Sequence, residues 1–110
     1  MMTNEEVVAL YAQARQHYGD EHQMKKCAEE CCELSTAILR LTNGCDGHSQ
    51  DECLDNVMEE LVDVDIMLAQ MGGIFEQTKN SRGLTLLDIY ERKLQRLKAR
   101  VEEEALAAKA

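Results

Sequence analysis

The spacing of apolar residues between positions 54 and 71 constrains the fold of this chain most strongly. Leucine, valine and methionine recur there at alternating intervals of three and four residues, at Leu54, Val57, Leu61, Val64, Leu68 and Met71. The same spacing occurs earlier in the chain, at Cys27, Cys31, Leu34, Ile38 and Leu41. Residues spaced in this way share one face of an α-helix, so the pattern predicts two long helices that pack through their apolar faces.

The composition favours helices in the rest of the chain as well. None of the 110 residues is proline and only six are glycine, so few residues interrupt a helix. Hydrophobic residues make up 45% and aromatic residues only 4%, so the core must consist mainly of aliphatic side chains. The length is close to the commonest domain size. We therefore expect an all-α, four-helix bundle-like fold in which residues 1–110 form a single domain.

Capping residues and glycines set the expected limits of the first two helices. The first helix is expected to begin after Thr3 or Asn4, whose side chains are good N-caps, and to end near Gly19. A second helix is expected to begin after Asp20 and to run to about Leu41, where a Thr-Asn-Gly sequence ends it.

Two further helices are expected in the second half of the chain. The segment Ser49–Glu52 matches a capping box that opens a third helix, and Gly72–Gly73 predicts a kink in it or an early end. The segment Thr85–Asp88 resembles another cap, and the fourth helix is expected to run to about residue 105. The acidic, alanine-rich tail of residues 102–110 is expected to fray.

The acidic charge of the chain narrows the choice of partners. The formal net charge is −9, and no basic stripe of the kind that binds a polyphosphate backbone is visible, so nucleic acid is not an expected partner. A small phosphorylated ligand is still compatible with this charge if bound cations bridge carboxylates and phosphates. The charge therefore favours a metal-dependent site.

The N-terminus and the cysteines indicate a cytoplasmic location. Residues 1–6 lack the basic flank and apolar run of a signal peptide, and no apolar stretch reaches membrane-spanning length, so no membrane partner is expected. The five cysteines are an odd number, and a reducing compartment keeps them as thiols, so no structural disulfide is expected. Zinc is not expected either, since no Cys-x-x-Cys knuckle is present.

Two acidic motifs lie beside the apolar faces of the two long helices. Residues three apart project from the same side of a helix, so Glu30 and Glu33 share one side and Glu60 and Asp63 share another. Packing the apolar faces together would bring these carboxylates close, and their mutual repulsion would be relieved by a hard cation such as Mg²⁺ or Mn²⁺. Either motif alone is typical of a solvated helix face, but the two together favour a metal site.

These motifs resemble those of the MazG-like, all-α nucleoside triphosphate pyrophosphohydrolases. That family carries Glu-Glu-x-x-Glu followed some tens of residues later by Glu-x-x-Asp, and the corresponding stretches here read KKCAEECCELSTAILR and NVMEELVDVDIMLAQM. The resemblance covers roughly residues 20–101, and leaves out the first helix and the tail.

The resemblance implies an enzyme that hydrolyses a nucleoside triphosphate to a monophosphate and pyrophosphate, with Mg²⁺ as cofactor. By motif position, it implies that Glu30, Glu33, Glu60 and Asp63 bind the metal. Glu29 would be a secondary ligand or would orient water. Metal ions activate water and stabilise charge on transferring phosphates, so this chemistry needs no histidine base.

Basic residues near the acidic motifs and on the last helix are candidate phosphate contacts. Lys93, Arg96 and Arg100 lie three and four residues apart on that helix, and Lys26 precedes the first acidic motif together with Lys25. Basic residues near a helix C-terminus also complement the helix dipole without binding any ligand, so both interpretations stay open.

Two other functional classes are alternatives to a pyrophosphohydrolase. A di-iron carboxylate bundle is disfavoured because neither acidic motif has a histidine at the required position. A non-catalytic helical interaction module with a solvated acidic face stays open, because no pattern alone proves catalysis. In either case four helices leave more apolar surface than one small chain covers, so a homodimer or homotetramer is expected.

Overall fold

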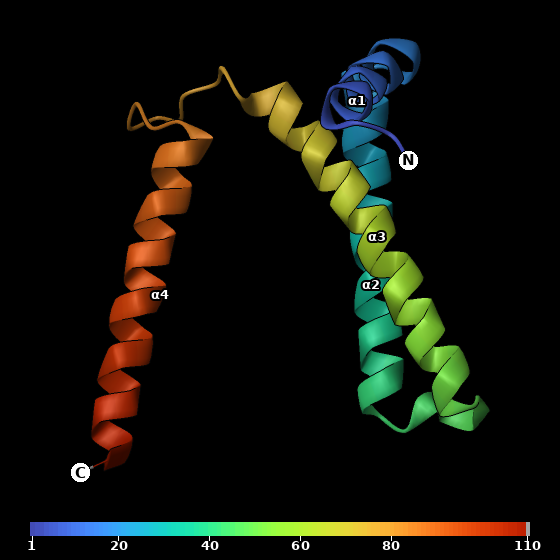
Figure 1. The fold of residues 1–110 in the computed structure, drawn as a ribbon, viewed down its shortest axis with the longest axis vertical. Coiled ribbons are helices and arrows are strands. Elements are labelled where there is room, and N and C mark those ends of the chain that lie inside the picture. Colours follow the sequence, from blue (N-terminus) through green and yellow to red (C-terminus); the bar gives the residue numbers. More distant parts are fainter. Residues whose placement is uncertain (110) are drawn as a thin grey trace. The chain divides into compact units, whose positions relative to one another are not determined.

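The computed structural model describes residues 1–109, and all of its regular structure is helical (Figure 1). In chain order the elements are α1 (Asn4–Tyr18), α2 (Asp20–Thr42), the short 3₁₀-helix η1 (Cys45–Gly47), α3 (Gln50–Phe75) and α4 (Leu86–Lys109). No strand occurs within residues 1–109, so the all-α class is confirmed. The described chain divides into two compact units, residues 1–74 and the segment that begins at Phe75.

The predicted capping residues begin the helices to which they were assigned. The Glu6 N–H donates to Thr3 Oγ1 at 3.1 Å at the start of α1, and the Glu52 N–H donates to Ser49 Oγ at 3.1 Å at the start of α3. Before α4, Asp88 N–H donates to Thr85 Oγ1 at 3.2 Å, while Thr85 N–H donates to Asp88 Oδ2 at 3.0 Å. These bonds satisfy N–H groups that have no partner within the helix.

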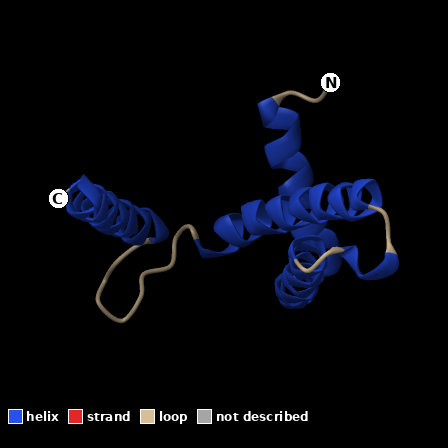
Figure 2. Ribbon diagram, turned by 90° about the horizontal axis from the view of Figure 1, so that it is seen from below, coloured by secondary structure: helices blue, strands red, loops and turns tan. Residues whose placement is uncertain are grey.

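Within the first unit, α2 and α3 run in opposite directions and face each other, and α1 lies across them (Figures 1 and 2). The buried apolar side chains of the two long helices and their connection form the core: Cys27, Ala37, Cys45, Cys53, Val57, Val64 and Met67. A buried hydrogen bond from Gln23 Nε2 to Gln70 Oε1, 2.8 Å long, also joins α2 to α3. This core holds the two acidic motifs opposite each other.

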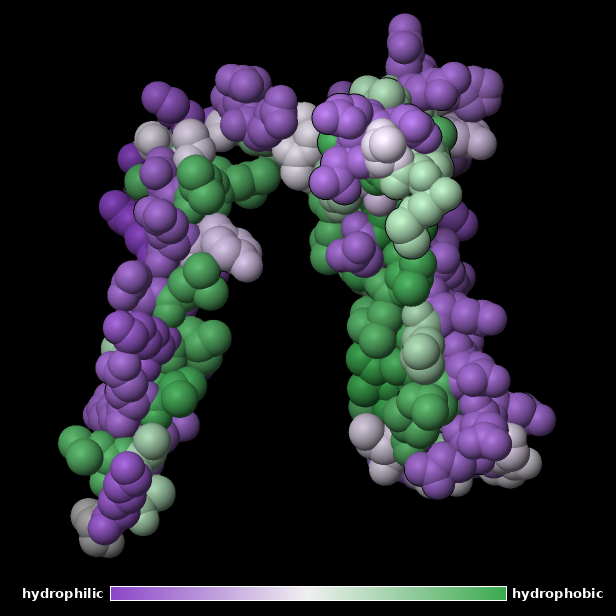
Figure 3. Space-filling view, viewed as in Figure 1, coloured by the Kyte–Doolittle hydropathy of each residue, from purple (hydrophilic) through white to green (hydrophobic). Residues whose placement is uncertain are grey.

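The contact between α2 and α3 buries only part of the predicted apolar faces. Val57 and Val64 are buried as expected, but Leu54, Leu61 and Leu68 stay 46%, 48% and 54% exposed. A two-helix contact covers only one flank of each apolar face, so the residues on the other flank remain uncovered. Figure 3 shows such uncovered apolar side chains along this pair of helices.

α3 continues through both glycines that were predicted to kink or shorten it. It ends at Phe75, two residues beyond Gly73. A Cβ atom at Gly73 would lie 2.5 Å from Nη1 of Arg15, so the glycine makes room for this α1 side chain. At Gly72 a Cβ atom would meet nothing within 4 Å.

The second unit consists of a loop followed by α4. In the loop, Asn80 Oδ1 accepts hydrogen bonds from the N–H groups of Arg82 and Leu84 at 2.9 and 3.0 Å. The expected end near residue 105 was wrong, because α4 runs to Lys109, and residue 110 of the tail lies outside the described residues. Alanine has the highest helix propensity, and an ion pair between Lys98 Nζ and Glu102 Oε1 at 3.9 Å adds weak support.

Within the described residues, no helix combines the length and apolar character needed to cross a membrane.

Candidate metal centre

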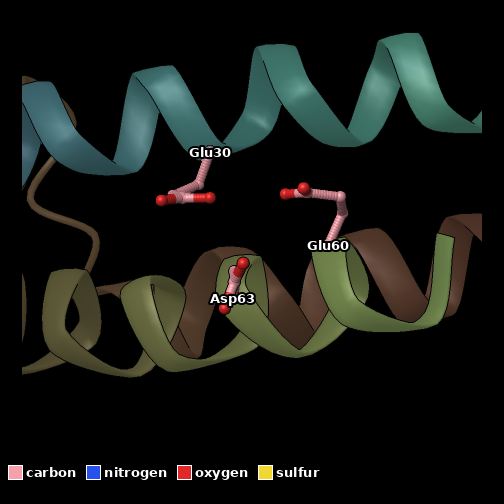
Figure 4. A group of neighbouring side chains, drawn as sticks. All are labelled: Glu30, Glu60 and Asp63. Atoms are coloured by element: carbon pink, nitrogen blue, oxygen red, sulfur yellow. The ribbon is translucent and has the colours of Figure 1, made fainter. Parts of the chain in front are cut away.

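Three carboxylates from the two acidic motifs converge between α2 and α3. Glu30 projects from α2 towards Glu60 and Asp63 of α3 (Figure 4). One carboxylate oxygen from each residue lies within 4.8 Å of the others. Oxygen atoms grouped at this distance match the ligand type that Mg²⁺ and Mn²⁺ prefer.

The core explains why these side chains meet. Glu30 follows the buried Cys27 by three residues on α2, and Glu60 follows the buried Val57 by three residues on α3. Asp63 directly precedes the buried Val64. Each carboxylate therefore lies at the edge of the contact between the helices, where burying the neighbouring apolar residue fixes its position.

Burial leaves two of the oxygens in this group without a hydrogen-bond partner. Glu30 is only 8% exposed, and the Oε2 atoms of both Glu30 and Glu60 are buried and unpaired. A buried polar atom without a partner costs free energy, and a charged one costs more. A divalent cation would give both oxygens a partner and would offset the repulsion between the carboxylates, so the residues fit a hard metal ion.

The electrostatics of Glu60 reflect this crowding. Burial raises the pKa of Glu60 above its usual value of 4.5, and the negative charges of Glu33, Asp63 and Glu30 raise it further. The shift is the one expected for a carboxyl group that shares a site with like charges. A bound cation would favour the ionised carboxylate and so lower the pKa of Glu60 again.

Lys26 is a positively charged residue that pairs with a member of the carboxylate group. Its Nζ atom lies 3.2 Å from Glu30 Oε1 and 3.8 Å from Glu29 Oε2. The hydrogen bond with Glu30, followed by the charge of Glu30, raises the pKa of Lys26. Glu30 thus has Oε1 paired with Lys26, while its Oε2 is buried without a hydrogen-bond partner.

The remaining predicted residues of the acidic motifs lie at the margin of the group. Glu33 is exposed and interacts with Glu60, and the two line a surface cavity of about 290 Å³. Glu29 is exposed and contacts the site through Lys26. Lys25 turns away, since its Nζ atom pairs with Glu21 Oε1 at 3.3 Å.

The structure adds Asn56, a residue that the sequence reasoning missed. Asn56 lies one turn before Glu60 on α3 and lines the same cavity as Glu33 and Glu60. Its four-residue spacing from Glu60 was the available signal, but a lone asparagine in a helix is rarely informative.

The predicted phosphate contacts of the last helix belong to the second unit. Lys93, Arg96 and Arg100 are all exposed on α4. Arg96 lines a surface cavity of about 760 Å³ with acidic neighbours that include Asp88 and Glu91. Their role as phosphate contacts stays a prediction.

No protein-family model, curated protein or solved structure matches this chain.

Proposed function

We propose that this chain is a Mg²⁺-dependent nucleoside triphosphate pyrophosphohydrolase with a MazG-like fold, in which Mn²⁺ can replace Mg²⁺. The observation that carries the proposal is the convergence of Glu30, Glu60 and Asp63, with two buried oxygens that have no partner. The choice of reaction rests on the resemblance of the two acidic motifs to those of that family. Nucleotide-pool house-cleaning in the cytoplasm would be the corresponding role.

In this proposal the metal ligands are Glu30, Glu60 and Asp63, and Glu33 completes the set from the margin. A divalent cation held there would supply charge neutralisation for the phosphates and would lower the pKa of water. Glu29 is exposed beside the site, where its carboxylate can orient an attacking water molecule. Attack on the α-phosphorus with departure of pyrophosphate yields the monophosphate.

The basic residues bind the phosphates in the same proposal. Lys26 is about half exposed next to Glu30, so its ammonium group can reach an anion that approaches from solvent. Lys93, Arg96 and Arg100, which are exposed on α4 in the second unit, stay the further candidate phosphate contacts, since planar guanidinium groups suit bidentate binding.

The direct test is turnover of purified protein on a panel of ribo- and deoxynucleoside triphosphates with Mg²⁺. We expect a monophosphate and pyrophosphate as products, and no turnover when the metal is chelated. Glu30→Gln and Glu60→Gln should abolish turnover while circular dichroism shows unchanged helicity. Release of orthophosphate, no turnover of any nucleotide, or full activity in either variant would refute the proposal.

A second candidate function is a non-catalytic interaction module, which the exposed apolar side chains of α3 favour. Leu54, Met58, Leu61 and Leu68 are each at least 46% exposed. Such a module would show neither turnover nor thermal stabilisation by Mg²⁺. Stabilisation by Mg²⁺ in wild type that is lost in Glu30→Gln would separate the two functions.

A further inference from the structure

Two buried thiols lie together where the connection after α2 meets the first turns of α3. Cys45 is 5% exposed and Cys53 is 3% exposed. The Cys53 thiol donates to the carbonyl oxygen of Cys45, with an Sγ to oxygen distance of 3.8 Å. The neighbouring Cys45, ahead of burial, is the largest cause that raises the pKa of Cys53 to about 11.

The backbone of the connection holds Cys45 in an unusual conformation. Cys45 and Asp46 have φ angles of 65° and 45°, in the left-handed region that residues with a Cβ atom rarely adopt. Such a conformation persists only where surrounding contacts stabilise it. The contact of the Cys53 thiol with the Cys45 carbonyl oxygen is such a contact, so the strained connection holds Cys45 beside Cys53.

Cys53 is one of the residues that line a surface cavity. Its volume is about 230 Å³, and its lining residues are Arg40, His48, Glu52, Cys53 and Asn56. A water molecule occupies roughly 30 Å³ in the liquid, so the cavity has room for a small peroxide. The positive charge of Arg40 acts to lower the pKa of Cys53, but the larger effects of Cys45 and burial raise it.

We propose that Cys45 and Cys53 form a dithiol that hydroperoxides oxidise slowly to an intramolecular disulfide, which cross-links the α2–α3 connection to α3. The cavity makes Cys53 the thiol that meets the oxidant, and Cys45 is the thiol that resolves it. This inference does not depend on the proposed nucleotide chemistry.

The reaction has two steps. The Cys53 sulfur attacks one oxygen of hydrogen peroxide, the O–O bond breaks, and water leaves with the thiol proton, which gives a sulfenic acid. The Cys45 sulfur then attacks the Cys53 sulfur, the S–O bond breaks, and a second water leaves with the Cys45 proton. Two thiols lose two electrons in total, and one peroxide is reduced to two water molecules.

The cross-link would change the stability of the helix pair. It closes a short loop of the chain and so removes conformational freedom from the unfolded state. For a loop and domain of this size, we expect the oxidised protein to melt on the order of 10 °C above the reduced protein. The high pKa of Cys53 keeps its thiolate scarce at neutral pH, so oxidation should be slow and should accelerate as pH rises.

The test uses the full chain, reduced, freed of reductant and incubated with hydrogen peroxide. Remaining thiols are alkylated under denaturing conditions and the protein is digested with trypsin. No lysine or arginine lies between Leu41 and Lys79, so both cysteines fall on one tryptic peptide. We expect this peptide to lose two hydrogen atoms and take up no alkyl group, and Tm to rise.

The exposed Cys31 and Cys32 are internal controls for the strength of the oxidant. The double variant Cys31→Ser, Cys32→Ser should still form the disulfide, and Cys45→Ala should instead leave a Cys53 sulfenic acid that dimedone traps. Two alkylated thiols on the peptide after Cys31 and Cys32 have been oxidised would overturn the proposal. A lower Tm after oxidation, or a disulfide from Cys45 or Cys53 to another cysteine, would overturn it as well.

Discussion

Within the carboxylate group, the surroundings of a side chain and the binding of a cation favour opposite charge states. Glu60 is held where burial and three like charges disfavour its ionised form, although ionised oxygens are what a divalent cation needs. Lys26 partly relieves this conflict from the other helix by pairing with Glu30. The charge state of the site therefore affects both the stability of the metal-free protein and its affinity for metal.

Glu60→Gln should stabilise the metal-free protein at pH 7. A carboxyl group whose pKa is raised by folding favours the folded state at low pH, and this contribution is lost as pH rises through the raised value, above 4.5. Wild type should thus have the lower Tm at pH 7 in EDTA, and the difference should shrink on acidification. Mg²⁺ should raise Tm in wild type but not in the variant.

The exposed neighbour Glu59 offers a matched control, since Glu59→Gln removes the same charge outside the group. It should leave the response to Mg²⁺ intact. A Glu60→Gln protein that melts below wild type at pH 7 in EDTA would show that Glu60 makes a favourable contact without metal.

Lys26→Met should tighten the binding of Mn²⁺ alone. Lys26 is a resident cation beside Glu30, so it repels an incoming divalent ion and stabilises the metal-free carboxylates. We expect Kd to fall roughly threefold to tenfold at low salt, with a smaller change at high salt. Isothermal titration calorimetry measures this directly.

Lys25→Met is the control for that measurement, because Lys25 makes a similar pair with Glu21 away from the carboxylate group. It should leave Kd unchanged. Weaker binding of Mn²⁺ by Lys26→Met would instead mean that Lys26 mainly orients the Glu30 carboxylate.

Among the elements, α3 shows most clearly what the sequence could and could not predict. Its beginning followed from Ser49 and Glu52, whose capping is a local interaction. Its continuation past Gly72–Gly73 was not predicted, and the reason for a glycine at position 73 could not be, because the side chain that uses the space there is Arg15, far away in sequence. Local interactions in the sequence thus predicted where α3 begins, whereas the contact near its end involves a residue from another helix.

Gly72→Ala and Gly73→Ala should differ in their effects on stability. Alanine is favoured over glycine within a helix by roughly 0.5–1 kcal/mol, and Gly72 has open space for a Cβ atom. Gly72→Ala should therefore stabilise the protein by about that amount. Gly73→Ala should stabilise it less, because the methyl group displaces the Arg15 guanidinium.

Chemical denaturation measures both changes, and an Arg15→Ala background isolates the contact. In that background the two glycine variants should become equivalent. If they still differ, a cause other than Arg15 distinguishes the two positions.

For the whole molecule, the all-α class and the convergence of Glu30 with Glu60 and Asp63 followed from apolar periodicity and three-residue spacing. The sequence did not predict which of the apolar residues are buried. Periodicity shows which residues share the apolar face of a helix, but not which side of that face a neighbouring helix covers. The pairing of Cys45 with Cys53 also escaped the sequence reasoning, because it depends on left-handed backbone in a loop.

The uncovered apolar flank of α3 leads to a prediction about assembly. We expect a homodimer or homotetramer at micromolar concentration in sedimentation velocity, because Leu61 and its apolar neighbours are about half exposed. Leu61→Glu should shift the protein towards monomer, whereas Glu59→Gln should not. A wild-type protein that sediments only as monomer would contradict this.

The hydrogen bond between Gln23 and Gln70 has a consequence for how the two long helices are aligned. Gln23 lies seven residues before Glu30, and Gln70 lies seven residues after Asp63, so each amide is two helical turns from its carboxylate. Sliding one helix along the other by a turn, about 5.4 Å, would separate the carboxylates and would take from Gln23 Nε2 and Gln70 Oε1 the hydrogen bond between them. The glutamine pair thus favours the alignment of the two helices in which the three carboxylates meet.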